Sequence, residues 1–136
     1  MDEWRQLEKF SFGDSPALAD ELAALVLAGI KTATCWAASE GASTHLGKRM
    51  VVLSGSGEPL AVIETVELTQ RRFNAVDAAF AYDEGEGDRT LAYWQKAHHR
   101  YFTRLGQFGE DMLLYCERFR VVARLDRVAE VEDQRG

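Results

Sequence analysis

The sequence predicts an α+β fold in which a small curved sheet or β-barrel, antiparallel or mixed, is flanked by helices. Three observations indicate this class. Segments of β-type composition outnumber helical ones, and two of them flank a Gly- and Ser-rich turn, which is typical of a hairpin. The order of elements is helix, strand, hairpin, two helices and a long strand, and this order favours mostly antiparallel pairing.

The length and composition indicate one globular domain. The 136 residues are 46% hydrophobic and 28% charged, which is ordinary for a soluble protein. We expect a single domain over 1–136, with a core at about 10–127 and a loose C-terminal tail. The charged start "MDEWRQLEKF" does not resemble a signal peptide, and no apolar run approaches the roughly 20 residues of a membrane span. A cytoplasmic location without membrane association is therefore expected.

The first helix is predicted within "SFGDSPALADELAALVLAG". Ser15 is a suitable N-cap, Pro16 suits the first turn, and Gly29 ends the segment. Leucines and a valine recur at helical spacing and form its apolar stripe: Leu18, Leu22, Leu25 and Val26. A strand-like segment then begins at Lys31 and runs to Trp36.

The remaining elements follow from local composition. A hairpin is predicted from the β-rich runs Met50–Leu53 and Leu60–Leu68. A short helix within 74–88 runs into an acidic turn, and Asp88 or Thr90 starts the next helix, which ends at about Leu105. A long β-type run, "MLLYCERFRVVARL", follows.

Charge and cysteine content limit the function. The net charge of −6 argues against strong non-specific binding to long nucleic acids, because phosphate neutralisation needs excess Lys and Arg. It does not exclude a nucleoside-sized ligand. Cys35 and Cys116 lack a CxxC partner and a nearby histidine pair, so we interpret them as buried free thiols.

Lys31 is the first candidate for chemistry, because it lies between a helix and a strand with Thr34 three residues on. Partial burial lowers the pKa of a lysine, so this residue could be a base, or else a cation that binds a carbonyl or phosphate oxygen. In a regular strand Lys31 and Thr34 point to opposite faces, and only a helix end or bulge brings them together. A surface lysine beside β-favouring threonines is the alternative.

The segment "YDEGEGD" is the second candidate. A clustered carboxylate can have a raised pKa and act as an acid. The spacing does not match a calcium-binding loop, and a solvated turn with an N-cap is the alternative.

The third candidate is "WQKAHHRYF", where Trp94, His98 and Phe102 lie at i, i+4 and i+8 and share one helix face. Such a stripe can form the floor of a base-binding pocket by stacking. Core packing with a satisfied histidine is the alternative. His99 is expected to point outward. No His or Cys lies at i+4 to either histidine, so neither zinc nor another metal or cofactor is expected.

Taken in order, Gly-x-Lys-Thr, Glu-Gly-Glu-Gly-Asp and Trp-x3-His-x3-Phe resemble the ASCH domain family over about Phe10 to Val122. The resemblance implies a barrel related to the PUA fold, with helices around it. It also implies RNA or modified-nucleoside ligands. Members include amidohydrolases that act on N4-acylated cytidine, ribonucleases that act on single strands, and proteins thought only to bind RNA.

The resemblance also implies roles for individual residues. The Lys-x-x-Thr pair of the amidohydrolases falls on Lys31 and Thr34, and their downstream glutamate falls best on Glu84, with Glu86 as the alternative. Many small members continue to an arginine where this chain has Trp36. The contact of that arginine is then missing, or it is supplied by Arg49 or Arg71. The expected ligand-binding residues are Trp36, Glu86, Trp94, His98, Arg49 and Arg71.

The mechanism implied has a neutral Lys31 that takes the proton of Thr34, whose hydroxyl attacks the amide. Glu84 then protonates the departing cytosine amine. In an alternative division of roles, Lys31 is a cation at the oxyanion and Thr34 is only a hydrogen-bond donor. Two other functions remain open: a ribonuclease, with a basic rim formed by Lys31, Lys48, Arg49, Arg71 and Arg72, and a non-catalytic RNA-binding module. The sequence leaves the oligomeric state open.

Overall fold

The computed structural model describes residues 3–126 of the chain and shows five strands and three α-helices. The helices are α1 (Pro16–Leu27), α2 (Ala78–Glu84) and α3 (Leu91–Arg104). The strands are β1 (Glu8–Phe10), β2 (Ala33–Ala37), β3 (Arg49–Leu53), β4 (Pro59–Arg72) and β5 (Leu113–Arg124). Short 3-10 turns occupy Glu3–Gln6, Ala38–Glu40 and Phe73–Ala75.

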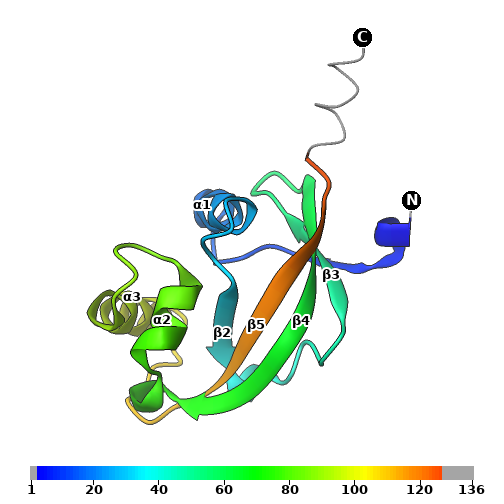
Figure 1. Cartoon of the computed structure of the whole chain (residues 1–136). Coiled ribbons are helices and arrows are strands. Elements are labelled where there is room, and N and C mark those ends of the chain that lie inside the picture. The colour runs from blue at the N-terminus through cyan, green and yellow to red at the C-terminus, as the bar shows by residue number, and fades with distance from the viewer. Residues whose placement is uncertain (1–2, 127–136) are drawn as a thin grey trace.

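The strands form one sheet in the order β1-β3-β4-β5-β2. All neighbouring pairs are antiparallel except β1–β3, which is parallel. The long strands β4 and β5 curve together, and register shifts interrupt their ladder at Val62/Ile63 and Thr65/Glu67 (Figure 1). Such irregularities bend and twist strands. The result is a curled half-barrel in an α+β protein, as the sequence predicts.

Most sequence-predicted elements are confirmed, with three differences. Ser15 Oγ accepts from the Leu18 amide, as an N-cap should, and Thr90 caps α3. Strand β1 was not predicted, because three residues are too few for a recognisable pattern. The second hairpin strand was predicted to end at Leu68, whereas β4 continues to Arg72. Finally, β2 begins at Ala33, so Lys31 precedes the strand.

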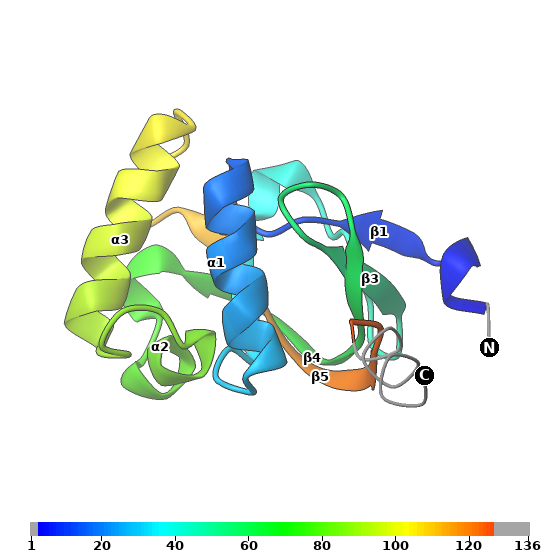
Figure 2. The same cartoon turned by 90° about the horizontal axis from the view of Figure 1, so that it is seen from above.

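The two faces of β5 bury different cores. Leu114 and Cys116 belong to a cluster with residues of α2 and α3, whereas Phe119 belongs to a cluster with residues of α1 and β3. Side chains alternate along a strand, so these clusters lie on opposite faces. In Figures 1 and 2, α2 and α3 lie together on one side of β2, and α1 lies between α3 and the β3–β4 hairpin. Strand β2 therefore lies near all three helices.

None of the helices within residues 3–126 is long and apolar enough to cross a membrane.

Candidate active site

A cleft of about 310 Å³ lies among the segment before α1, α1 itself, the start of β2, the end of α2, and α3. This volume is at the lower end of the range of about 300–1,000 Å³ that is typical of small-molecule sites. Aromatic side chains line part of it, among them Phe12, Tyr93 and Tyr101. Its ionisable and nucleophilic groups are Glu21, Lys31, Thr34, Cys35, Glu84, Glu86, His98, Arg100 and Arg104.

A tight connection between α1 and β2 positions Lys31. The backbone amides of Ile30 and Lys31 both donate to the Leu25 carbonyl, at 3.0 and 3.1 Å, and the Thr32 amide donates to the Asp83 carbonyl at 2.7 Å. Lys31 is thus held outside the alternation of β2. It lines the same cleft as Thr34, and its side chain is only 1% exposed. Two arrangements were expected to bring Lys31 and Thr34 together, a helix end or a bulge, and the structure shows the helix end.

A glycine turn positions the two glutamates. Gly85 ends α2 in the left-handed region, with φ of 76°, and a Cβ atom there would lie 2.6 Å from the Ile30 carbonyl oxygen. Only glycine fits this conformation and this close approach without strain. The turn after α2 is therefore packed directly against the Lys31 turn, and Glu84 and Glu86 both face the lysine.

Lys31 binds both carboxylates. Its Nζ donates to Glu84 Oε1 at 3.1 Å and to Glu86 Oε2 at 2.9 Å, and more weakly to the Glu84 carbonyl at 3.4 Å. Burial alone lowers the pKa of Lys31, but the two negative charges and their hydrogen bonds outweigh it, so the pKa of Lys31 lies above its ordinary value. This direction favours a charged Lys31 over the expected neutral lysine that acts as a base.

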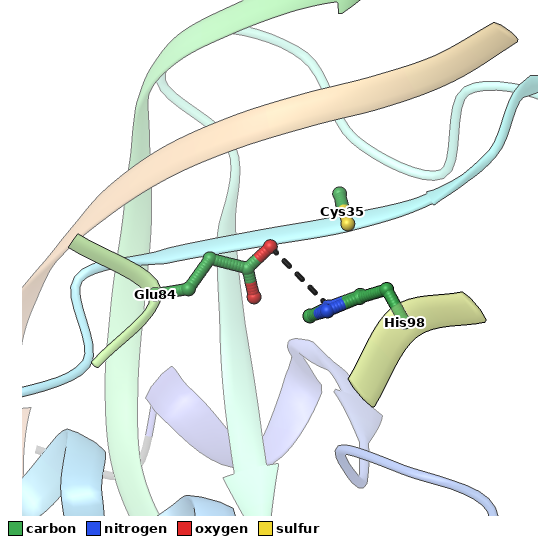
Figure 3. Close-up of side chains that lie close together, drawn as sticks. All are labelled: Cys35, Glu84 and His98. Carbon is green, nitrogen blue, oxygen red and sulfur yellow. Dashed lines mark ion pairs between the residues drawn. The ribbon is translucent and has the colours of Figure 1, made fainter. Parts of the chain in front are cut away.

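The other oxygen of Glu84 faces α3. Trp94 Nε1 donates to Glu84 Oε2 at 2.9 Å, and His98 Nε2 lies 3.6 Å from the same oxygen (Figure 3). Burial raises the pKa of Glu84, but the charges of Lys31 and His98 and the hydrogen bond from Trp94 outweigh this effect, so the net pKa of Glu84 is below its usual range. Glu84 therefore stays ionised, and it is a poor proton donor for a leaving amine.

Cys35, Glu84 and His98 bring one ligand atom each to within 4.8 Å of one another (Figure 3). Thiolate, carboxylate and imidazole are a ligand set that zinc accepts. Here, however, Lys31 and Trp94 already donate to the two oxygens of Glu84. Burial and the Glu84 charge also raise the pKa of the Cys35 thiol, which keeps it protonated. We interpret the group as a cluster of close polar side chains and assign no metal to it.

Thr34 lines the cleft, and its hydroxyl forms no hydrogen bond with any described residue. Glu117 lies opposite it across the β2–β5 ladder and is 6% exposed. Thr65 Oγ1 donates to Glu117 at 2.6 Å and lies 2.7 Å from the Thr44 hydroxyl. Burial raises the pKa of Glu117, although the Thr65 hydrogen bond and the Lys31 charge act in the opposite direction. A second buried carboxyl group thus lies on the same sheet face as Thr34.

The other predicted ligand-binding residues divide into two groups. Glu86 and His98 line the cleft, and Trp94 lies directly behind them, 2% exposed and stacked on His98 at 4.3 Å. The remaining three do not line it: Trp36 stacks on Tyr115, Arg49 pairs with Glu64, and Arg71 pairs with Asp77.

The basic rim suggested for a ribonuclease does not form. Lys31 is buried between its glutamates, and Lys48 pairs with Glu8. Arg49 and Arg71 are paired as described above, and Arg72 donates to the Asp111 carbonyl. Of this predicted set, only Lys31 lines the cleft.

Cys35 and Arg100 line the cleft, but neither was predicted to belong to the site. Cys35 follows Thr34 directly, and neighbouring side chains in a strand point to opposite faces. Strand alternation therefore gave no reason to expect Thr34 and Cys35 in the same cleft. Arg100 lies seven residues after Tyr93 on α3, which is helical spacing for one face. Once Tyr93 is known to line the cleft, this spacing could have located Arg100.

A family model of the ASCH domain matches residues 8–123. The chain belongs to the ASCH domain family. The match covers every strand and helix around the cleft of this ASCH domain, including the three residues Lys31, Thr34 and Glu84. No curated protein matches the chain.

Two solved structures support the assignment. This ASCH domain is similar to the ASCH domain from Lactobacillus crispatus JV V101, with 36% identity and a TM-score of 0.80 over 90% of this chain and 83% of that one. It is also similar to protein EF3133 from Enterococcus faecalis V583, with 35% identity and a TM-score of 0.80 over 90% and 80% of the two chains. The PUA-like fold implied by the sequence resemblance is therefore confirmed, with a curled half-barrel as its sheet.

Proposed function

We propose that this ASCH domain is an amidohydrolase that removes the acyl group from N4-acylated cytidine. The observation that carries the proposal is the meeting of a buried ammonium group, a hydroxyl and carboxylates in one small cleft. Lys31, Thr34 and Glu84 are the residues on which the family resemblance places the amidohydrolase triad, and all three line the cleft. The chain also carries a net charge of −6, which favours an uncharged nucleoside over a nucleic acid with many phosphates as the ligand.

In this mechanism Lys31 acts as a cation. An ammonium group has three donors, and the bond from Lys31 to the Glu84 carbonyl is the longest of its three at 3.4 Å. The carbonyl oxygen of the acyl amide replaces this weak partner. As the oxygen gains negative charge in the transition state, the fixed ammonium stabilises it. The free hydroxyl of Thr34 donates the second hydrogen bond to the same oxygen.

The carboxylates hold the cation and accept a proton. Glu84 is 1% exposed and fixes Lys31 from behind. The side chain of Glu86 is 19% exposed, so it can contact a water molecule in the cleft and accept the proton that this water loses as it attacks the amide carbon. The C–N bond then breaks, and the amine nitrogen must gain a proton from another group, because Glu84 stays ionised.

The test incubates the purified protein with N4-acetylcytidine and, in parallel, with single-stranded RNA. Chromatography measures the cytidine that is released. We expect cytidine from the wild type and intact RNA. Thr34→Val should lower kcat/KM by at least about tenfold, the effect of one lost hydrogen bond to a developing charge. Thr32→Val is the matched control, since the Thr32 hydroxyl bonds the Asp83 carbonyl and does not line the cleft.

Cleaved RNA without cytidine release would replace the proposal with the ribonuclease function. Binding of N4-acetylcytidine without turnover, lost in Lys31→Ala, would replace it with a binding module. An equal loss of activity in Thr32→Val and Thr34→Val would remove Thr34 from the mechanism.

A further inference from the structure

His98 is a titratable group of the cleft that the mechanism above does not use. It lies on α3, is 8% exposed and lines the cleft. Its ring stacks on Trp94 at a centroid distance of 4.3 Å, and its Nδ1 lies 2.9 Å from the Trp94 carbonyl oxygen. These two contacts fix both the position and the orientation of the imidazole.

The contacts also define where the protons of His98 lie. A carbonyl oxygen only accepts, so Nδ1 carries a hydrogen and Nε2 is the atom that gains or loses a proton. Nε2 lies 3.6 Å from Glu84 Oε2, which is beyond a hydrogen bond. A proton on Nε2 is therefore attracted by the carboxylate but forms no hydrogen bond with it.

The surroundings of His98 favour its charged form. Glu84 at the end of α2 and Glu86 in the turn that follows both face it, and the Cys35 thiol approaches from β2. Glu21 of α1 and Arg100 of α3 line the same cleft. Burial lowers the pKa of His98, but the charges of Glu84 and Glu86 and the hydrogen bond to the Trp94 carbonyl outweigh this effect, so the pKa lies above its ordinary value of 6.5.

Three neighbouring groups, Glu84, Lys31 and Cys35, are poor proton donors near neutral pH. Glu84 is held ionised, and the carboxylates hold the proton of Lys31 more tightly than usual. The pKa of the Cys35 thiol is raised well above its ordinary value. Histidine is the side chain whose ordinary pKa lies nearest to neutrality, so it matches the demand of acid catalysis best.

We propose that His98 is the general acid that protonates the departing amine, with Nε2–H directed into the cleft and Glu84 stabilising the imidazolium. This inference rests on the proposed amidohydrolase function. As the C–N bond breaks, its electron pair stays on the exocyclic nitrogen, which takes the Nε2 proton, and the carboxylic acid and cytidine are released. The proton that Glu86 accepted from water restores the charged form of His98, so the hydrolysis balances.

The test compares the pH dependence of kcat for N4-acetylcytidine in the wild type and in His98→Gln. In the wild type kcat should fall as pH rises through the pKa of His98, above 6.5, because the deprotonated ring is inactive. In His98→Gln kcat should be roughly 10²- to 10⁴-fold lower at pH 6.5, and the alkaline fall should disappear. His99→Gln is the matched control, since His99 is exposed and lies outside the cleft.

The outcomes separate the two proposals. If the wild type releases no cytidine, the proposed function and the role of His98 fail together. If the wild type is active but His98→Gln keeps the alkaline fall, only the role of His98 is refuted, because a purely structural histidine lowers kcat equally at every pH. If His98→Gln does not fold, the wild type still provides a test through NMR titration of its His98 ring, and a ring that stays neutral down to pH 6 would refute the inference.

Discussion

Lys31 Nζ and Glu84 Oε1 lie 3.1 Å apart although 53 residues separate them in the sequence, and both side chains are almost completely buried. A buried ion pair is expensive to desolvate, and it is stable only when its remaining donors and acceptors are satisfied. Here Glu86, Trp94 and the Glu84 carbonyl supply those bonds. The pair joins the α1–β2 connection to the end of α2, so one contact contributes to both the fold and the cleft.

Replacing Lys31 by Met should impair both activity and stability. The buried Glu84 would lose its counter-ion, and breaking a buried pair from one side costs about 3–5 kcal/mol of unfolding free energy. Loss of the cation should also lower kcat/KM by at least about 10²-fold. Chemical denaturation and the cytidine-release assay measure the two effects.

Lys48→Met is the matched control for that change. Lys48 pairs with Glu8 at 2.9 Å, but Glu8 is 56% exposed, and exposed pairs contribute no more than about 1 kcal/mol. Equal destabilisation by the two substitutions would contradict the buried-pair account.

Gly85→Ala should disrupt the site through the backbone. A Cβ atom at Gly85 would lie 2.6 Å from the Ile30 carbonyl oxygen, and φ is 76°. Left-handed strain alone costs about 1–2 kcal/mol, and we expect Gly85→Ala to lower the unfolding free energy by well more than this. We also expect reduced activity, because Glu84 and Glu86 would move away from Lys31. Denaturation and turnover assays on the purified variant report both.

Gly106→Ala isolates the strain component, since its φ is 72° and a Cβ atom there meets nothing within 4 Å. If Gly85→Ala were no more destabilising than Gly106→Ala, the close packing of the two turns would have no energetic importance.

Glu117→Gln should stabilise the protein in a pH-dependent way. Burial raises the pKa of Glu117 in the folded state, so the folded wild type binds this proton more tightly than the unfolded chain and loses stability as pH rises from about 4.5 through the folded-state pKa. Glutamine has no such proton. The Tm of Glu117→Gln should therefore match the wild type near pH 4 and exceed it at pH 7.

Glu58→Gln, at an exposed turn position between β3 and β4, is the control in the same thermal scans. Parallel pH dependence in wild type and Glu117→Gln would show that the carboxyl group titrates as it does in the unfolded chain.

Thr34→Ser should retain most activity, because serine keeps the hydroxyl that donates to the oxyanion. No acyl group should accumulate on Thr34, since water is the nucleophile in the mechanism proposed here. Mass spectrometry of wild type quenched during turnover of N4-acetylcytidine checks this. An acetyl adduct on Thr34 would instead make Thr34 the nucleophile and require a base other than Lys31.

The fold was largely predictable, because its signals are local. Ser15, Thr90 and Gly29 mark helix ends by their own chemistry, and the Gly/Ser turn marks the β3–β4 hairpin. Strand β1 was not predictable, since it is held by parallel pairing with β3 rather than by any pattern of its own.

The site was predictable in its residues but not in its protonation states. Sequence and resemblance identified Lys31, Thr34, Glu84 and His98, all of which line one cleft. The charge of Lys31 depends on two carboxylates more than fifty residues away, which approach only because the Gly85 turn packs on Ile30. The absence of Arg49 and Arg71 from the cleft likewise follows from partners on neighbouring elements, Glu64 and Asp77. Local sequence carries no signal for either.

The permanent positive charge of Lys31 is the claim on which the mechanism depends, and NMR titration of its ε-methylene group tests it most directly. We predict no titration of this signal through the ordinary lysine pKa of about 10.4, so that the ammonium form persists for as long as the protein stays folded. A midpoint at or below neutral pH would contradict the account and restore Lys31 as a base.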